Sequence, residues 1–267
     1  MTTPALTHEH QEAIKQQEAL CNEIARAEEE KCHLLYHVKP YLESRYLVAV
    51  GNNRLELLRI QTTVFRLKLK LEKIQAAINR DDDVNEDLID ELIELEMQEH
   101  LKQLKKEAEI LNAASMFINL EKLTEEEIKE IKLLYYKLAK QLHPDIYPGD
   151  INRAALWLKL SEAYSLNDLE AMRALAAVAE LSLKSEDLIT GVEQLKKKNE
   201  QLAAYFSKLI QKLQEIKVMF PFTISEYIED QGWVNNENNE TLNAISACMD
   251  EKATLEKMIQ QLLNNEQ

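Results

Sequence analysis

The central part of the chain lacks the two residues that most often interrupt helices. No glycine lies between Gly51 and Gly149, and no proline lies between Pro40 and Pro144. The whole chain holds 4 glycines and 5 prolines in 267 residues, well below the average usage of about 7% and 5%. Because tight turns and strand ends depend on these residues, the sequence predicts an all-α fold and excludes a fold rich in β-structure.

The charge of the chain limits its partners. With 32 basic and 47 acidic residues its net charge is -15, whereas binding to nucleic acid needs a basic surface. We therefore expect no nucleic-acid partner. No stretch approaches the about 18 apolar residues of a membrane span, and residues 1–15 lack the cationic and apolar parts of a signal peptide. We expect a cytoplasmic protein with no membrane partner.

Nothing in the sequence predicts a metal, a cofactor or an enzyme. The cysteines Cys21, Cys32 and Cys248 are odd in number and form no CxxC pair. His33 and His37 lie four residues apart beside Cys32, but no third ligand follows at a suitable spacing. The chain also lacks a glycine-rich phosphate loop and a nucleophile beside a base. We expect these histidines and cysteines to pack within or on helices.

The first 115 residues are predicted to form helices and a coiled coil. A helix over residues 8–38 should end at Pro40, and a second helix should begin after Gly51. Residues 79–85 supply a turn, so the helices on either side should pair as an antiparallel hairpin. The helix before this turn alternates steps of three and four at Leu57, Ile60, Val64, Leu67, Leu71, Ile74 and Ile78, and the helix after it has Met97, Leu101, Leu104, Ala108, Leu111 and Ile118.

A second antiparallel hairpin is predicted for residues 182–267. Its first helix continues a heptad seam to Phe220 with Asn199 at one seam position, and its second helix covers residues 241–262. Such long helices would make the molecule elongated. The seams do not reveal whether they close within the chain or across a homodimer. The apolar seam residues of the first helix are Leu188, Val192, Leu195, Leu202, Phe206, Leu209, Leu213, Ile216 and Phe220.

A helix with two distinct faces is predicted between these regions. Thr124 and Glu127 form a capping box that starts the helix, and Pro144 should end it near His143. Asp150 or Asn152 then caps a further helix that carries an apolar face. The first helix has Ile128, Ile131, Leu134, Tyr135, Leu138, Ala139 and Leu142 on one face, and Lys129, Lys132, Lys137 and Lys140 on the opposite face.

This segment resembles the J domain of the DnaJ co-chaperone family over about a quarter of the chain. The resemblance is carried by residues 135–145, which read YYKLAKQLHPD, by Pro148-Gly149-Asp150, by Trp157 and Leu160, and by Glu162-Ala163-Tyr164. It covers residues 116–181 as a J-domain-like helical domain, flanked by helical regions as in some bacterial J-domain proteins. Residues 116–120, which stand where the family has its first helix, lack that helix's usual glycine and continue the preceding helix.

The resemblance implies that the chain docks on a DnaK-type ATPase chaperone and stimulates its ATP hydrolysis. It assigns His143, Pro144 and Asp145 to an exposed loop that contacts the chaperone, next to Lys129, Lys132, Tyr136, Lys137 and Lys140. The flanking helices would bind an unknown client, a partner protein or a second copy. The alternative hypothesis is a structural or adaptor coiled-coil protein, in which the J-like segment is only a packing unit and recruits no chaperone.

Overall fold

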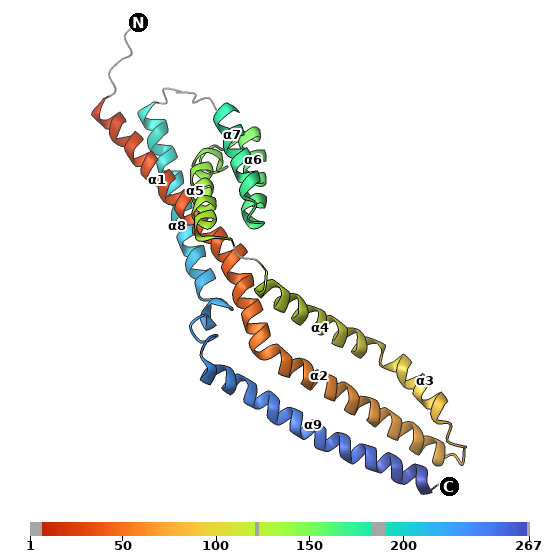
Figure 1. Ribbon diagram of the computed structural model, residues 1–267. Helices are drawn as coiled ribbons and strands as arrows, with labels where there is room; N and C mark the ends of the chain where they lie inside the picture. The colour runs from red at the N-terminus through yellow and green to blue at the C-terminus, as the bar shows by residue number, and fades with distance from the viewer. Residues whose placement is uncertain (1–6, 121–122, 183–190, 266–267) are drawn as a thin grey trace. The chain divides into compact units, whose positions relative to one another are not determined.

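The computed structural model describes residues 7–120, 123–182 and 191–265. Within these ranges the chain forms helices and turns and no strand, which confirms the predicted all-α fold (Figure 1). None of the described helices is both long and apolar enough to cross a membrane. The chain divides into two compact units, the first comprising Met1–Pro40 and Glu121–Thr223 and the second comprising Tyr41–Leu120 and Ile224–Gln267.

The first unit pairs the start of the chain with a helix almost two hundred residues later. Helices α1 and α8 lie side by side (Figure 1) and run parallel, because Glu9 pairs with Lys196 near one end and Glu30 pairs with Lys217 near the other. The helices of this unit are α1 (His8–His33), α5 (Glu125–Leu142), α6 (Ile151–Ser165), α7 (Leu169–Ser182) and α8 (Val192–Lys217).

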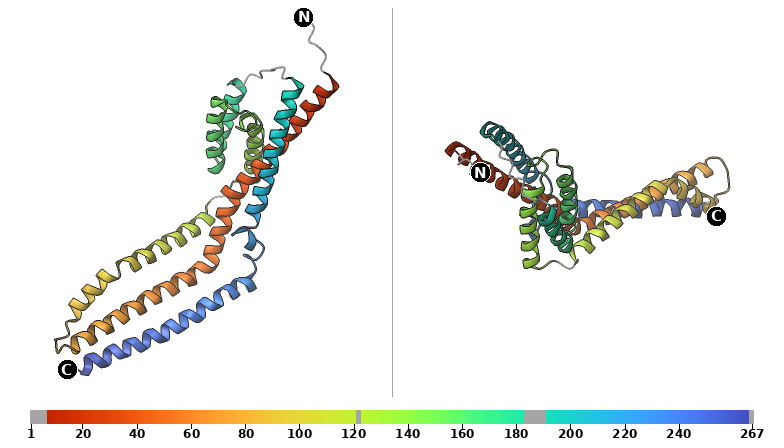
Figure 2. Two further views of the ribbon diagram at one scale, coloured as in Figure 1. Left: turned by 180° about the vertical axis from the view of Figure 1, so that it is seen from behind. Right: turned by 90° about the horizontal axis from the view of Figure 1, so that it is seen from above.

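The second unit is built around α2. Figure 2 shows α2 between α9 on one side and α3 with α4 on the other. Lys68 binds Glu251 of α9, and Arg66 binds Glu94 of α3 at 3.1 Å. The helices of this unit are α2 (Lys39–Ile78), α3 (Glu86–Glu96), α4 (Gln98–Ile118) and α9 (Gln231–Asn265); α2 begins in the first unit, at Lys39.

The predicted first hairpin is confirmed. The α2 helix ends at Ile78, Asn85 caps α3, and α3 with α4 then returns antiparallel to α2. Lys70 of α2 pairs with Glu86 of α3, and the earlier α2 residue Phe65 stacks on the later residue His100 of α4. This order shows that the two arms run antiparallel. Ile74, Ile89, Ile93 and Met97 form the buried core of this hairpin.

The predicted second hairpin is wrong. The seam residues of α8 pack on α1 in the first unit, where Leu202 contacts Ile24. Those of α9 pack on α2 in the second unit, where Leu255 contacts Ile60 and Val64. The heptad positions were predicted correctly, but a heptad seam does not specify which other seam it pairs with. Leu188, the first residue of the predicted seam, lies outside the described residues.

Two predicted helix boundaries are also wrong. Pro40 does not end a helix, because the π-helical turn Leu34–Val38 leads directly into α2, with the Lys39 N–H bonded to the Leu34 carbonyl. The wider turn makes room for the proline ring, which in a regular α-helix would clash with the carbonyl four residues before it. Gly51 lies inside α2 rather than before it, and its bare Cα allows Leu111 of α4 to approach: a Cβ there would lie 2.9 Å from Leu111 Cδ1.

The division into units differs from the predicted domain boundaries. The predicted N-terminal region of residues 1–115 is split after Pro40, and its first helix belongs with the J-like segment. The last turn of α4 contains Met116 and Phe117, as the continuation of the preceding helix predicted, and it falls in the second unit. Within the first unit, α5 packs against α1 as well as against α6 and α7.

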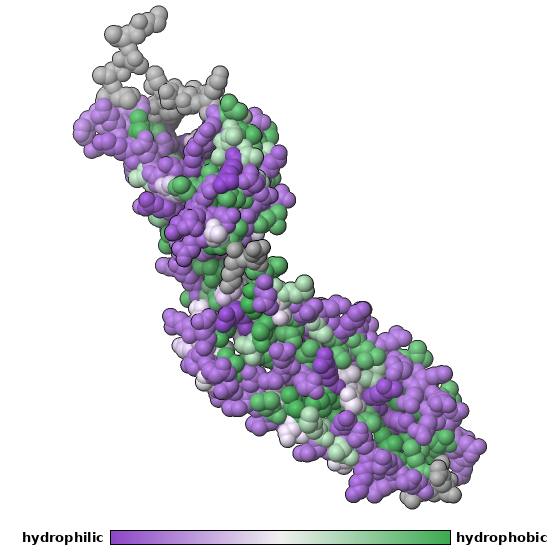
Figure 3. All heavy atoms as spheres, in the orientation of Figure 1, coloured by the Kyte–Doolittle hydropathy of each residue, from purple (hydrophilic) through white to green (hydrophobic). Residues whose placement is uncertain are grey.

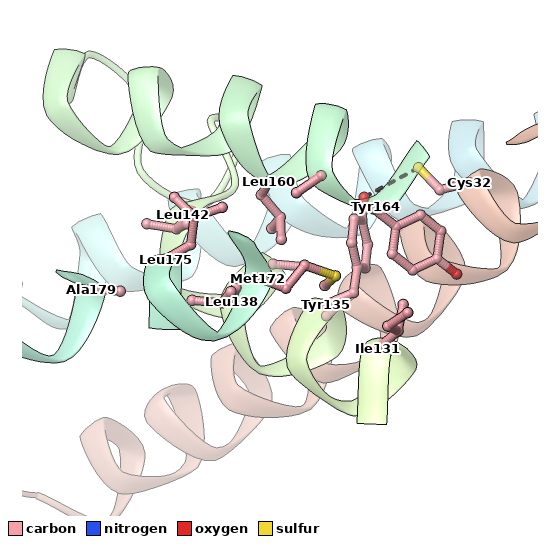
Figure 4. Packing of buried hydrophobic residues seen from close by; sticks show 13 residues of the cluster. Cys32, Ile131, Tyr135, Leu138, Leu142, Leu160, Tyr164, Met172, Leu175 and Ala179 are labelled. Atoms are coloured by element: carbon pink, nitrogen blue, oxygen red, sulfur yellow. Dashed lines mark hydrogen bonds between the residues drawn. The ribbon is translucent and has the colours of Figure 1, made fainter. Parts of the chain in front are cut away.

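The J-like segment has a single core made by three helices and completed by α1. Figure 4 shows Leu138 and Tyr135 of α5 among side chains of α6 and α7, with Tyr164 beside Tyr135. Cys32 of α1 closes one side of this core, and its Sγ lies 3.2 Å from the Tyr135 hydroxyl. The buried members are Ala25, Cys32, Ile131, Tyr135, Leu138, Ala139, Leu142, Leu160, Ala163, Tyr164, Met172, Leu175 and Ala179.

The second unit exposes apolar side chains between charged ones, as the mixed colours of its surface in Figure 3 show. Leu88, Leu92 and Leu95 of α3 are 54%, 43% and 64% exposed. Their spacing of four and three residues places them on one face of α3, away from the buried Ile89 and Ile93.

Candidate functional site

The loop between α5 and α6 carries His143-Pro144-Asp145 and is called the J-like loop below. Its position is set by the way α5 begins and ends. The capping box predicted at its start is present: the Thr124 N–H donates to Glu127 Oε2 at 2.8 Å, and the Glu127 N–H donates to Thr124 Oγ1 at 3.3 Å. At its other end His143 leaves the helical conformation with φ -60° and ψ 128°, the extended region that a residue before proline favours. The helix therefore presents His143-Pro144-Asp145 at its carboxyl end.

The loop ends where Asp150 caps α6. Its side chain accepts a hydrogen bond from the Arg153 N–H at 2.9 Å, so of the two caps considered the structure uses Asp150. Gly149 takes a positive φ of 85° just before this cap, a conformation that favours glycine. Since the helices on both sides pack into one core, the loop is held at both of its ends.

The three signature residues differ sharply in exposure. Pro144 and Asp145 are exposed, whereas His143 is only 2% exposed. The sequence predicted that all three would stand on an exposed loop, and for His143 this differs from the structure. Its imidazole lies edge-on to Trp157 of α6, with ring centroids 4.6 Å apart, and is covered on its other side by α1 and α8.

Tyr205 of α8 joins His143 to Glu28 of α1. The Tyr205 hydroxyl lies 3.3 Å from His143 Nε2 and donates to Glu28 Oε1 at 2.6 Å. Lys31 pairs with the other carboxylate oxygen of Glu28 at 2.5 Å. The imidazole and the carboxylate are thus connected through one phenol that comes from a third element.

The hydrogen bonds determine the tautomer of His143. The Asp145 N–H donates to His143 Nδ1 at 3.1 Å, so Nδ1 must carry a lone pair. The proton of a neutral ring then sits on Nε2, where it points at the Tyr205 oxygen. Because the Tyr205 hydroxyl donates its hydrogen bond to Glu28, the phenol oxygen can accept a hydrogen bond from His143.

Glu28 is a buried carboxylate that stays charged. Burial would raise the pKa of its carboxyl, but the neighbouring His143 imidazole, the Lys31 ammonium and the Tyr205 hydroxyl outweigh burial and lower the pKa to about 2. Burial and the Glu28 charge raise the pKa of the Tyr205 phenol, so the phenol keeps its proton. A charged acceptor and a neutral donor make their 2.6 Å hydrogen bond a strong one.

An apolar contact covers the loop beside this network. Ile146, the residue after the signature, is 2% exposed and packs between Ile24 of α1 and Leu202 of α8. Tyr147 follows, with the Arg153 guanidinium 3.7 Å from its ring centroid and the Lys198 ammonium of α8 at 5.5 Å. The loop is therefore held against α1 and α8 by both polar and apolar contacts.

Two of the predicted basic residues on α5 are exposed. Lys129 pairs with Glu125 at 3.7 Å and Lys137 pairs with Glu180 of α7 at 2.5 Å. Both pairs lie at the surface, where ion pairs contribute little to stability. These two ammonium groups can therefore exchange their present partners for another acidic surface at small cost.

The other predicted residues on this face are half-buried because α1 packs beside them. The Tyr136 hydroxyl donates to Asn22 of α1 at 2.9 Å, and the Lys140 ammonium lies 5.6 Å from the Tyr136 ring centroid. Lys132 lies close enough to His33 and His37 to contribute to lowering the pKa of both histidines. The predicted basic face is thus real, but α1 covers part of it.

The sequence analysis missed Glu28, Tyr205 and Ile146. Glu28 follows Ile24 by four residues and so lies on the apolar face of its helix, where a charged residue is unusual. Tyr205 follows the seam residue Leu202 by three positions, next to the seam residue Phe206. These signals mark polar groups within a coiled-coil seam, but they do not indicate that the groups reach His143.

His33 and His37 pack rather than gather ligands. Their ring centroids lie 5.7 Å apart, and His37 also packs on Tyr164 at 5.0 Å. Across the described part of the chain, no group of three or more His, Cys, Asp or Glu side chains is arranged to hold a metal ion. Burial raises the pKa of the Cys32 thiol, so Cys32 contributes to the core as an uncharged side chain.

Comparisons with protein-family models, with curated proteins and with solved structures give no match for this chain.

Proposed function

We propose that this protein is a J-domain co-chaperone that docks on a DnaK-type chaperone and stimulates its ATP hydrolysis. The observation that carries the proposal is the position of His143-Pro144-Asp145 at the carboxyl end of α5, a helix whose inner face forms one core with α6 and α7. This core fixes the loop between two helices, and the exposed Asp145 carboxylate can reach a partner directly.

The charges around the loop suit an acidic partner surface. Lys129 and Lys137 are exposed on the same helix that leads to the signature, although the chain as a whole is acidic. Local patches of opposite charge accelerate docking and set its orientation more than they add affinity. In this proposal the chemistry of ATP hydrolysis belongs to the chaperone, and the chain contributes contacts rather than a catalytic group.

One observation favours a second candidate function. His143 is 2% exposed beneath α1 and α8, so a partner cannot reach its imidazole in this arrangement. A structural or adaptor protein, in which the J-like segment is a packing unit that recruits no chaperone, would have no need of an accessible histidine. The two candidates therefore differ in whether the loop ever acts on a chaperone.

The rate of ATP hydrolysis by a purified DnaK-type chaperone, measured with the full-length chain, separates the two candidates. The co-chaperone predicts stimulation that is lost in Asp145→Asn and in His143→Gln. Asp145→Asn is the cleaner variant because this side chain is exposed, with 51% of its surface accessible. The matched control is Glu200→Gln, which neutralises an exposed carboxylate on α8 and should leave stimulation unchanged. Equal rates with and without the wild-type chain would favour the adaptor.

A further inference from the structure

We infer that α8 is a releasable cover over the J-like loop, and that the chain holds its own chaperone-docking site closed until α8 separates from α1. The inference rests on the proposed function, because it states how access to that docking site is controlled. It identifies α8, rather than α1, as the part that moves.

The α1 helix is built into the core of the J-like segment. Ala25 and Cys32 are buried members of that core. Asn22 accepts a hydrogen bond from Tyr136, and Glu29 accepts one from Tyr164 at 2.8 Å. Removing α1 would therefore break the core itself, so α1 is a fixed part of the domain.

In the described part of the chain, α8 reaches the J-like segment at the loop. Tyr205 reaches His143, Leu202 packs on Ile146, and the Lys198 ammonium lies over the Tyr147 ring. The buried core of α5, α6 and α7 contains no residue of α8. Separation of α8 would uncover the loop and leave that core intact.

The seam between α8 and α1 contains a feature that weakens it. Asn199 is 2% exposed in this seam; its Nδ2 donates to the Ala13 carbonyl at 2.8 Å, but its Oδ1 is buried with no hydrogen-bond partner among the described residues. A buried acceptor without a partner is destabilising.

Tyr205 adds a polar link to the closed state, beside the packing of its ring on the apolar seam. Its hydroxyl holds His143 and Glu28 together only while α8 is in place. If α8 separates, the His143 Nε2–H loses the Tyr205 hydroxyl, keeps Glu28 Oε1 of α1 at 3.7 Å, and becomes accessible to an acceptor on the side that α8 covered.

Two substitutions on α8 should shift the equilibrium between the closed and the open state in opposite directions. Tyr205→Phe keeps the ring but removes the hydroxyl, and the loss of its hydrogen bonds should favour opening about tenfold. Asn199→Leu removes the unpaired acceptor and adds an apolar seam contact, so it should favour closure about tenfold. Neither residue belongs to the set that the proposed function places against the chaperone.

The test measures two properties of the full-length wild-type chain and both variants. The first is the rate at which diethyl pyrocarbonate modifies His143, followed by mass spectrometry, with the exposed His8 as internal reference. The second is the stimulated ATPase rate of the DnaK-type chaperone. We expect both rates to rise about tenfold in Tyr205→Phe and to fall about tenfold in Asn199→Leu.

The outcomes separate this inference from the proposed function. A His143 modification rate that is equal in all three chains would contradict the inference that α8 is a releasable cover over the loop. A changed modification rate together with full and equal stimulation would also overturn it, because the loop would then be used without release of α8. A modification rate that shifts as expected, with no stimulation by any chain, would overturn the proposed function and the regulatory role inferred from it, and would leave α8 as a structural cover.

Discussion

The hydroxyl of Tyr205 lies 3.3 Å from Nε2 of His143, although the two residues are 62 positions apart in the chain. This contact places a side chain of α8 on the first residue of the J-like signature. It explains why a residue expected at the surface is buried, and it makes the accessibility of His143 depend on a helix outside the J-like core.

The core of the J-like segment should depend strongly on Leu138. Its side chain is fully buried, so Leu138→Ala should lower the free energy of unfolding by about 2–5 kcal/mol. The matched control on the same helix is Leu133→Ala, because Leu133 is 67% exposed and should change stability by no more than about 0.5 kcal/mol. Urea unfolding followed by Trp157 fluorescence in a Trp233→Phe background reports on this unit. Equal effects of the two variants would contradict the assigned core.

The packing of the π-helical turn Leu34–Val38 on Tyr164 of α6 should weaken in mild acid. Burial first, and then the positive charges of His33 and Lys132, lower the pKa of His37 below its usual 6.5. A histidine with a lowered pKa leaves stability unaffected above about pH 6.5 and reduces it as the pH falls from there through the lowered value. Urea midpoints should therefore fall between pH 7.5 and pH 5.5.

The His37→Gln variant is the control for this pH dependence. A glutamine keeps a polar group near Asn167, whose Nδ2 lies 3.3 Å from His37 Nδ1, but it cannot take up a proton in this range. The variant should lose part of the decline in urea midpoint, with the remainder contributed by His33, whose pKa burial also lowers. A decline as steep as in the wild type would show that His37 does not cause it.

The approach of α4 to α2 should depend on Gly51. Gly51→Leu should destabilise the second unit by about 1–3 kcal/mol, because even a Cβ there would meet Leu111. Adding Leu111→Ala should recover part of this loss by making room. Gly51→Ala should be close to neutral, since the Leu111 side chain can move and alanine favours a helix. Trp233 fluorescence in a Trp157→Phe background follows this unit; no recovery in the double variant would contradict the contact.

The parts of the fold that depend on local pattern were predictable from the sequence. The capping box of Thr124 and Glu127, the turn after Ile78 and the 4,3 spacing of the α8 seam from Leu195 to Ile216 are all present. Each follows from residues that are close together in the chain. Asn199, placed in the seam by spacing alone, is buried there as predicted.

The features that were missed depend on long-range pairing. Nothing local in the sequence says that α8 packs on α1 and α9 on α2, because any of these seams could pair with any other. The burial of His143 requires Glu28 and Tyr205, which lie on two further helices. The continuation past Pro40 was missed because one π-helical turn accommodates the proline. The seam pairing and the burial of His143 are decided by contacts between residues far apart in the chain, whereas the continuation past Pro40 is a local adjustment of the backbone.

The central claim is that the J-like loop acts on a DnaK-type chaperone, and single-turnover ATP hydrolysis by that chaperone tests it most directly. The measurement compares the Tyr205→Phe chain, in which the cover is loosened, with the same chain carrying Asp145→Asn. We predict that Tyr205→Phe accelerates hydrolysis more than the wild type does and that Asp145→Asn abolishes the acceleration. Hydrolysis that the Tyr205→Phe chain leaves unchanged, or an acceleration that persists in the double variant, would contradict the account.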